Sequence, residues 1–166
     1  MLSFKNIKQK QAKQAGFTLL EVLLVVAIIA ILAGIVIIAI NPGKNLGDAR
    51  NAQRSADVNT IINGTYQYTL DNNGVLPPVG GRTGAVVIST TPTEVCSTAA
   101  VSCTGLVDLG VLTTAGKYVI AIPKDPQCPT GCNANGVGYT IAKDANNRLI
   151  VAAPGAENGK TISVNK

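Results

Sequence analysis

The chain has 166 residues, enough for one modest domain and an accessory segment, and its formal net charge is +5. Four of its 14 Lys and Arg residues, but none of its nine Asp and Glu residues, precede Phe17. The remainder is therefore nearly neutral and gives no support for specific nucleic-acid binding, and the lack of His excludes histidine-based catalysis and histidine metal sites.

A long apolar run follows the lysine-bearing leader, and Glu21 is its one charged residue between positions 17 and 40. A helix over 17–40 would be about 36 Å long, enough to cross a bilayer core of about 30 Å. The lysines before the run predict a cytoplasmic N-terminus and a remainder outside. An ordinary secretory signal is a poor alternative, because the apolar core is long and no clean Ala-x-Ala site follows it before Asn41.

The segment GFTLLE, residues 16–21, after a short basic leader resembles the class III signal of type IV pilins and pseudopilins. The resemblance is strong over about residues 10–60 and general in layout beyond them. It implies that a prepilin peptidase removes residues 1–16 by cutting between Gly16 and Phe17 on the cytoplasmic side. It also implies that Phe17 is then N-methylated and that the helix over 17–40 is retained.

Glu21 has two compatible interpretations. Thr18-x-x-Glu21 fits a capping box, and a first-turn glutamate is favoured by the helix dipole by about 0.3–1 kcal/mol. Capping explains a helix start but not a charge set at the edge of a membrane segment. The resemblance implies that Glu21 neutralises the N-terminal amine of a neighbouring subunit, and an unpaired buried charge would make such a partner valuable. We therefore expect Glu21 to act in assembly.

The helix is expected to break at Asn41-Pro42-Gly43, because Pro42 has no backbone donor and Gly43 loosens the chain. One interpretation is a plain turn at the membrane exit. The resemblance implies another, a segment that unwinds when the helix packs into a filament. Both stay open.

An amphipathic helix is expected from Leu46 to Leu70, within a segment 41–71 that forms the second half of the long helix. Its face toward the head is predicted to be apolar or small: Leu46, Ala49, Ala52, Ala56, Ile62 and Tyr66, with Val58, Ile61 and Thr65 alongside. Arg50, Arg54, Asp48 and Asp57 are expected on the opposite, solvated face. Phosphate binding by the two arginines is the less favoured alternative.

Residues 72–166 predict a small, β-rich head with a thin core. The expected elements are a strand near 85–89, a helix or turn at 106–114, a hairpin of 138–142 and 148–152, and a strand at 161–164. Pro123-Lys124-Asp125-Pro126 is expected to fix a turn. The fold class is therefore α+β and pilin-like: a long N-terminal helix, membrane-spanning in its first half and amphipathic in its second, packed on a small antiparallel sheet.

All four cysteines, Cys96, Cys103, Cys128 and Cys132, lie in the predicted exterior part. Disulfides 96–103 and 128–132 are favoured because each closes a short loop, and crossed pairing stays open. Structural zinc is disfavoured by the spacing, the lack of His and the exported location, and free thiols are a further alternative.

No motif for nucleophilic catalysis or phosphate binding occurs, so no catalytic residue, cofactor or metal is predicted, and nothing favours an enzyme. Major pseudopilins of secretion systems often hold calcium in a C-terminal loop. Asp125 and Asp144 are too sparse to predict that site here.

The function expected first is a structural subunit of a type IV pilus, serving adhesion, motility or DNA uptake. The alternatives are a pseudopilin of a type II-like secretion system and a non-polymerising single-pass membrane protein with a disulfide-stapled binding head. The implied partners are further copies in a helical filament, the prepilin peptidase, the membrane assembly platform and cytoplasmic ATPases. The expected location is the inner or cytoplasmic membrane with the head outside, and the cell surface after assembly.

Overall fold

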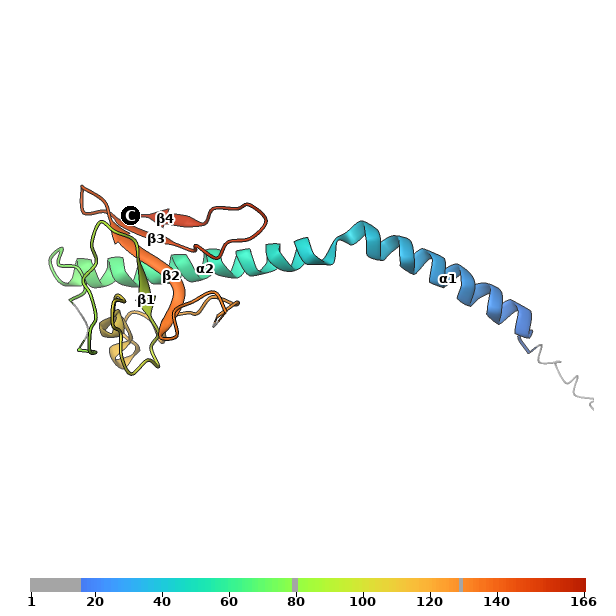
Figure 1. Cartoon of the computed structure of the whole chain (residues 1–166), viewed down its shortest axis with the longest axis horizontal. Coiled ribbons are helices and arrows are strands. Elements are labelled where there is room, and N and C mark those ends of the chain that lie inside the picture. The colour runs from blue at the N-terminus through green and yellow to red at the C-terminus, as the bar shows by residue number, and fades with distance from the viewer. Residues whose placement is uncertain (1–15, 79–80, 129) are drawn as a thin grey trace, which may run out of the picture. The chain divides into compact units, whose positions relative to one another are not determined.

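The computed structural model describes residues 16–78, 81–128 and 130–166, so most of the predicted leader lies outside the described residues. The chain divides into two compact units, Met1–Pro42 and Gly43–Lys166. The first unit contains helix α1, Leu19–Ile40. The second contains nearly all of helix α2, Pro42–Asp71, a short 3-10 helix η1, Gly110–Gly116, and the four strands (Figure 1).

Helix α1 begins where its sequence provides a cap. The Thr18 hydroxyl accepts a hydrogen bond from the Glu21 backbone N–H at 3.2 Å, which satisfies one of the free donors of the first turn. With 22 residues and a mean hydropathy of 3.5, the helix is long and apolar enough to cross a membrane. Every residue of α1 is exposed within the single chain.

The helix ends at Asn41, whose backbone is left-handed with φ of 45°. Asparagine tolerates this conformation better than most residues, so the chain can stop one helix and start another within a single residue. Pro42 is the first residue of α2, a position where its missing N–H costs no hydrogen bond. Gly43 lies within the first turn of α2 rather than at the break.

Four strands form one antiparallel sheet in the order β1-β2-β3-β4. They are β1, Thr93–Cys96; β2, Gly136–Lys143; β3, Leu149–Ala152; and β4, Ser163–Asn165. The predicted hairpin of 138–142 and 148–152 and the predicted strand at 161–164 are thus confirmed as β2, β3 and β4.

The strand predicted near 85–89 is wrong. Val86 makes only an isolated bridge to Val107, and the strand of this region is β1. In the fold the Glu94 carboxylate accepts the backbone N–H of Gly138 at 2.8 Å, which anchors β1 beside the start of β2.

The core lies between α2 and the sheet. Val58, Ile61 and Ile62 of α2 are fully buried together with Tyr139 and Ile141 of β2. Leu112 of η1 joins this cluster, in the region where a helix or turn was expected. The fold is therefore α+β, with a small antiparallel sheet on a helix, as predicted.

The buried face of α2 differs from the predicted one in its first half and at Tyr66, which is 41% exposed. Leu46 is 57% exposed, and Ala49, Ala52 and Ala56 are also exposed. The buried residues are instead Gly47, Asn51, Arg54, Val58, Ile61, Ile62, Gly64 and Thr65. This face is polar near the start of the helix because polar loops, not the apolar core, cover it there.

Candidate functional site

Gly16 and Phe17 lie just before α1 and are exposed. The exposed fraction of Phe17 is 83%. Glu21 lies one turn later and lines an open groove with Phe17, Val22, Val25 and Val26. Among the described residues no Lys or Arg pairs with the Glu21 carboxylate. Phe17, which follows Gly16 in the chain, therefore lies beside Glu21, and the Glu21 carboxylate lies among apolar side chains.

A second cluster surrounds Arg54 in the first half of α2, where the Arg54 side chain is 0% exposed. Its guanidinium holds the Asp125 carboxylate with two hydrogen bonds, of 2.6 Å from Nε and 3.1 Å from Nη2. Nη1 donates to Glu157 at 2.8 Å and to Asn51 at 3.1 Å, and Nη2 donates to Gln127 at 2.7 Å. All five N–H groups of Arg54 thus have an acceptor, as a buried guanidinium requires.

The prediction that Arg54 faces solvent is therefore wrong. Arg54 is four residues before Val58 and seven before Ile61, so it lies on the same face of α2 as the core residues. Its acceptors other than Asn51 come from two loops that are distant in sequence. Arg50 is partly exposed and donates to Glu157 from Nε at 2.6 Å.

Asp57 also differs from the prediction. It is only partly exposed, because the buried Tyr139 hydroxyl donates to its carboxylate at 2.6 Å. Burial raises the pKa of Asp57, and this hydrogen bond opposes the rise.

Each cysteine pair closes a short loop of the head. The structure joins Cys96 to Cys103 and Cys128 to Cys132, the same pairs that the short-loop argument favoured. Cys96 and Cys103 are fully buried, whereas Cys128 and Cys132 are partly exposed. Gly138, with φ of 82°, leaves room for the second pair, since a side chain there would meet the Cys132 sulfur at 2.8 Å.

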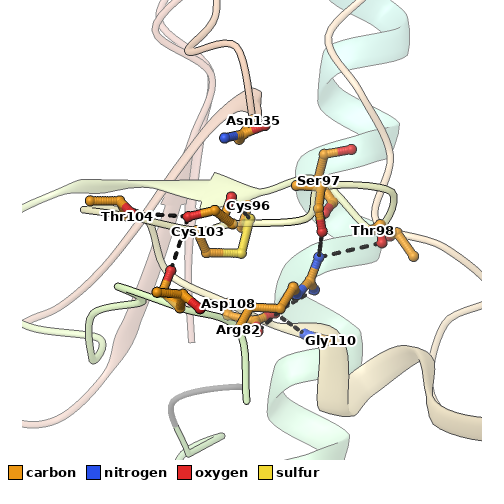
Figure 2. Close-up of a disulfide and its surroundings, with 12 residues drawn as sticks. Arg82, Cys96, Ser97, Thr98, Cys103, Thr104, Asp108, Gly110 and Asn135 are labelled. Carbon is orange, nitrogen blue, oxygen red and sulfur yellow. Dashed lines mark hydrogen bonds and ion pairs between the residues drawn. A yellow bond between two sulfur atoms is a disulfide. The ribbon is translucent and has the colours of Figure 1, made fainter.

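Arg82 supports the loop of the first disulfide, as Figure 2 shows. Its guanidinium pairs with the buried Asp108 carboxylate, to which Nε donates at 2.9 Å. Nη1 donates to the backbone carbonyl of Ser97 at 2.6 Å, next to Cys96. The Asp108 carboxylate also accepts the Gly110 backbone N–H at 2.8 Å, which ties this loop to the start of η1.

The carboxylates of the C-terminal half do not fit a calcium ion. Calcium requires six to eight oxygen ligands, several of them from carboxylates. Both oxygens of Asp125 already accept from Arg54, and Asp144 accepts from Arg148 and from the backbone N–H of Asn146. In the part of the chain that the structure describes, no three His, Cys, Asp or Glu side chains are grouped to hold a metal ion.

The sequence interpretation missed the cluster of Arg54, Asp125 and Glu157. Two signals pointed to it. Arg54 shares the helical spacing of Val58 and Ile61, and Asp125 lies in a rigid Pro-Lys-Asp-Pro turn that follows a buried Ile122. Glu157 carried no such signal, because it lies in a polar loop of ordinary composition.

Comparisons with known proteins agree with the N-terminal motif. A family model described as the prokaryotic N-terminal methylation motif matches residues 11–37. Type II secretion system core protein G of Vibrio cholerae serotype O1 is 32% identical over 118 residues, which cover 71% of this chain and 68% of that protein. A protein of the same description from Aeromonas hydrophila is 38% identical over 64 residues, 39% of this chain and 43% of that protein. No solved structure matches the chain.

Proposed function

The chain belongs to the pilin-like family of type II secretion system core protein G, and from this membership we propose that it is a pseudopilin. In this role it is a non-enzymatic subunit that polymerises from the membrane into the short filament of a type II-like secretion system. The observation that carries the proposal is Glu21, the one charged residue of an otherwise apolar and fully exposed α1. A carboxylate in this position is unfavourable for a lone membrane helix and favourable where another copy supplies a cation.

The relatives favour secretion over a pilus. Both are named as core protein G of a type II secretion system, and the match to the Vibrio protein extends over 118 residues, well beyond the methylation motif. The sequence alone favoured a type IV pilus subunit first. The relatives support that function less well than they support a pseudopilin.

Processing follows from the same proposal. A prepilin peptidase cuts between Gly16 and Phe17, and the new terminal amine of Phe17 is N-methylated. The exposure of both residues supports access by such an enzyme. α1 then anchors the subunit in the cytoplasmic membrane with its head outside, and the assembly platform and its ATPases move the subunit into the filament.

Two substitutions at Glu21 separate its two roles. Glu21→Gln keeps a polar side chain but removes the charge, whereas Glu21→Ala removes both; in either variant the Thr18 hydroxyl can still accept the backbone N–H of residue 21. We expect both variants to be exported and cut, and both to be depleted from filaments by about tenfold or more when coexpressed with the natural chain, measured by mass spectrometry of purified filaments. If Glu21→Gln enters filaments normally, the charge is not needed and Glu21 is only a cap.

Deletion of the gene distinguishes the two filament functions. Loss of exported enzymes from the culture medium, with surface fibres and surface motility unchanged, is the result expected of a pseudopilin. Loss of surface fibres with normal secretion would show a pilus subunit instead. In either case the mature chain is expected to begin at N-methylated Phe17.

A further inference from the structure

Two loops of the head each bring one carboxylate to a largely buried site beside α2. Asp125 follows the turn at Pro123, and Glu157 lies in the loop between β3 and β4. The side chain of Asp125 is 5% exposed and that of Glu157 is 23% exposed. Carboxylates gathered this way repel one another and need a cation to hold them together.

The positive charge between these two carboxylates is supplied by a side chain of the protein itself. The fully buried Arg54 bonds Asp125 and Glu157 at once, with all of its N–H groups paired. Arg50 adds a second positive charge on Glu157. Two guanidinium groups therefore balance two carboxylates. A divalent cation entering here would be repelled by both arginines, and all four oxygens of the two carboxylates already accept hydrogen bonds from them.

We propose that Arg54 is a built-in cation that organises the two C-terminal loops, so that the head of this pseudopilin-family chain folds without calcium. The proposal departs from the calcium-holding loop that the family resemblance implies, and it does not depend on whether the filament serves secretion or a pilus. The close packing around Arg54 agrees with it. A side chain on Gly155 would begin 3.2 Å from the Asp125 carboxylate and 3.7 Å from the Arg54 guanidinium.

The loop that Arg54 organises also holds the first turns of α2. Asn51 donates to the Glu157 backbone carbonyl at 2.9 Å, and its own side-chain oxygen accepts the Glu157 backbone N–H at 2.9 Å. The Asn158 side chain donates to the Lys44 carbonyl at 2.9 Å, and Lys160 pairs with Asp48. Displacement of this loop would free about three helical turns of α2 from their polar cover.

Thermal unfolding of the full chain in detergent, followed by circular dichroism, tests calcium independence directly. We expect the melting temperature to change by less than about 1 °C between millimolar calcium chloride and EGTA. A saturated specific calcium site would raise it by on the order of 5–15 °C. A rise of several degrees with calcium, or an equal fall with EGTA, would overturn the proposal.

Substitution of Arg54 tests the built-in cation. We expect Arg54→Gln to lower the melting temperature by about 5–15 °C, because it leaves buried carboxylates unpaired. Arg148→Gln is the matched control, since Arg148 is 59% exposed in its pair with Asp144, and we expect a change of about 1 °C or less. Arg54→Lys, which keeps the charge but not the planar fork, should melt in between and serves if Arg54→Gln does not fold. If Arg54→Gln or Arg54→Lys has the same melting temperature as the natural chain, the guanidinium is not required.

Discussion

Glu157 is a carboxylate whose ionisation depends on two arginines. Hydrogen bonds from Arg50, and then from Arg54, lower the pKa of Glu157 from its ordinary value of 4.5 to about 2. Because the folded-state pKa lies below the unfolded-state pKa, Glu157 stabilises the fold at pH values above about 4.5. That contribution is lost as the pH falls from 4.5 toward 2.

Glu157→Gln tests this pH dependence. At pH 7 the variant is expected to melt below the natural chain, because Arg50 and Arg54 lose a charged acceptor. The difference between the two melting temperatures should shrink as the pH is lowered from 4.5 to 2, where the natural Glu157 becomes protonated. Thermal melts at several pH values measure it. A difference that stays constant down to pH 2 would contradict the role of this ionised carboxylate.

At the scale of elements, the two disulfides differ in exposure. Cys96 and Cys103 are buried, and the loop between them is also held by Arg82 and Asp108, as seen in Figure 2. Cys128 and Cys132 are partly exposed. Since a thiolate must reach a sulfur atom to open a disulfide, the exposed pair should be reduced first.

Alkylation followed by mass measurement tests both the pairing and its order of reduction. The native chain is expected to take up no alkyl group. Reduction at increasing concentrations of dithiothreitol should first give a chain alkylated at Cys128 and Cys132. Alkylation of Cys96 and Cys103 should appear only after denaturant has loosened the fold. Four alkylated cysteines in the native, unreduced chain would refute the disulfides, and early labelling of Cys96 would refute the order.

The elements that the sequence predicted well are those whose signals are local. The apolar run of α1 can be recognised within a short stretch of sequence, as can the strand composition of β2 and β3 with the polar turn between them. The buried face of α2 could not be predicted in the same way, because Arg54 is buried by acceptors 71 and 103 residues away. β1 was missed for a similar reason, since the strand that it pairs with, β2, is distant in sequence, as is the Gly138 N–H that the Glu94 carboxylate accepts.

At the scale of the whole molecule, the two units that meet at Pro42 are stabilised in different ways. The second unit is held by the core between α2 and the sheet, by two disulfides and by the Arg54 cluster. α1 buries no residue within the chain and so depends on an apolar environment. In hydrocarbon an unwound helix would leave backbone groups without hydrogen-bond partners, which strongly favours the helical state.

The two units should therefore unfold separately in detergent. On heating, we expect one cooperative loss of ellipticity from the head, while a residual helical signal from the 22-residue α1 persists to higher temperature. Hydrogen exchange resolved by peptide gives the sharper measurement. Just above the head transition, amides of 19–40 should remain protected while those of 58–65 exchange fully. Simultaneous loss of protection in both segments would mean that α1 depends on the head for its structure, and that the chain behaves as one cooperative unit.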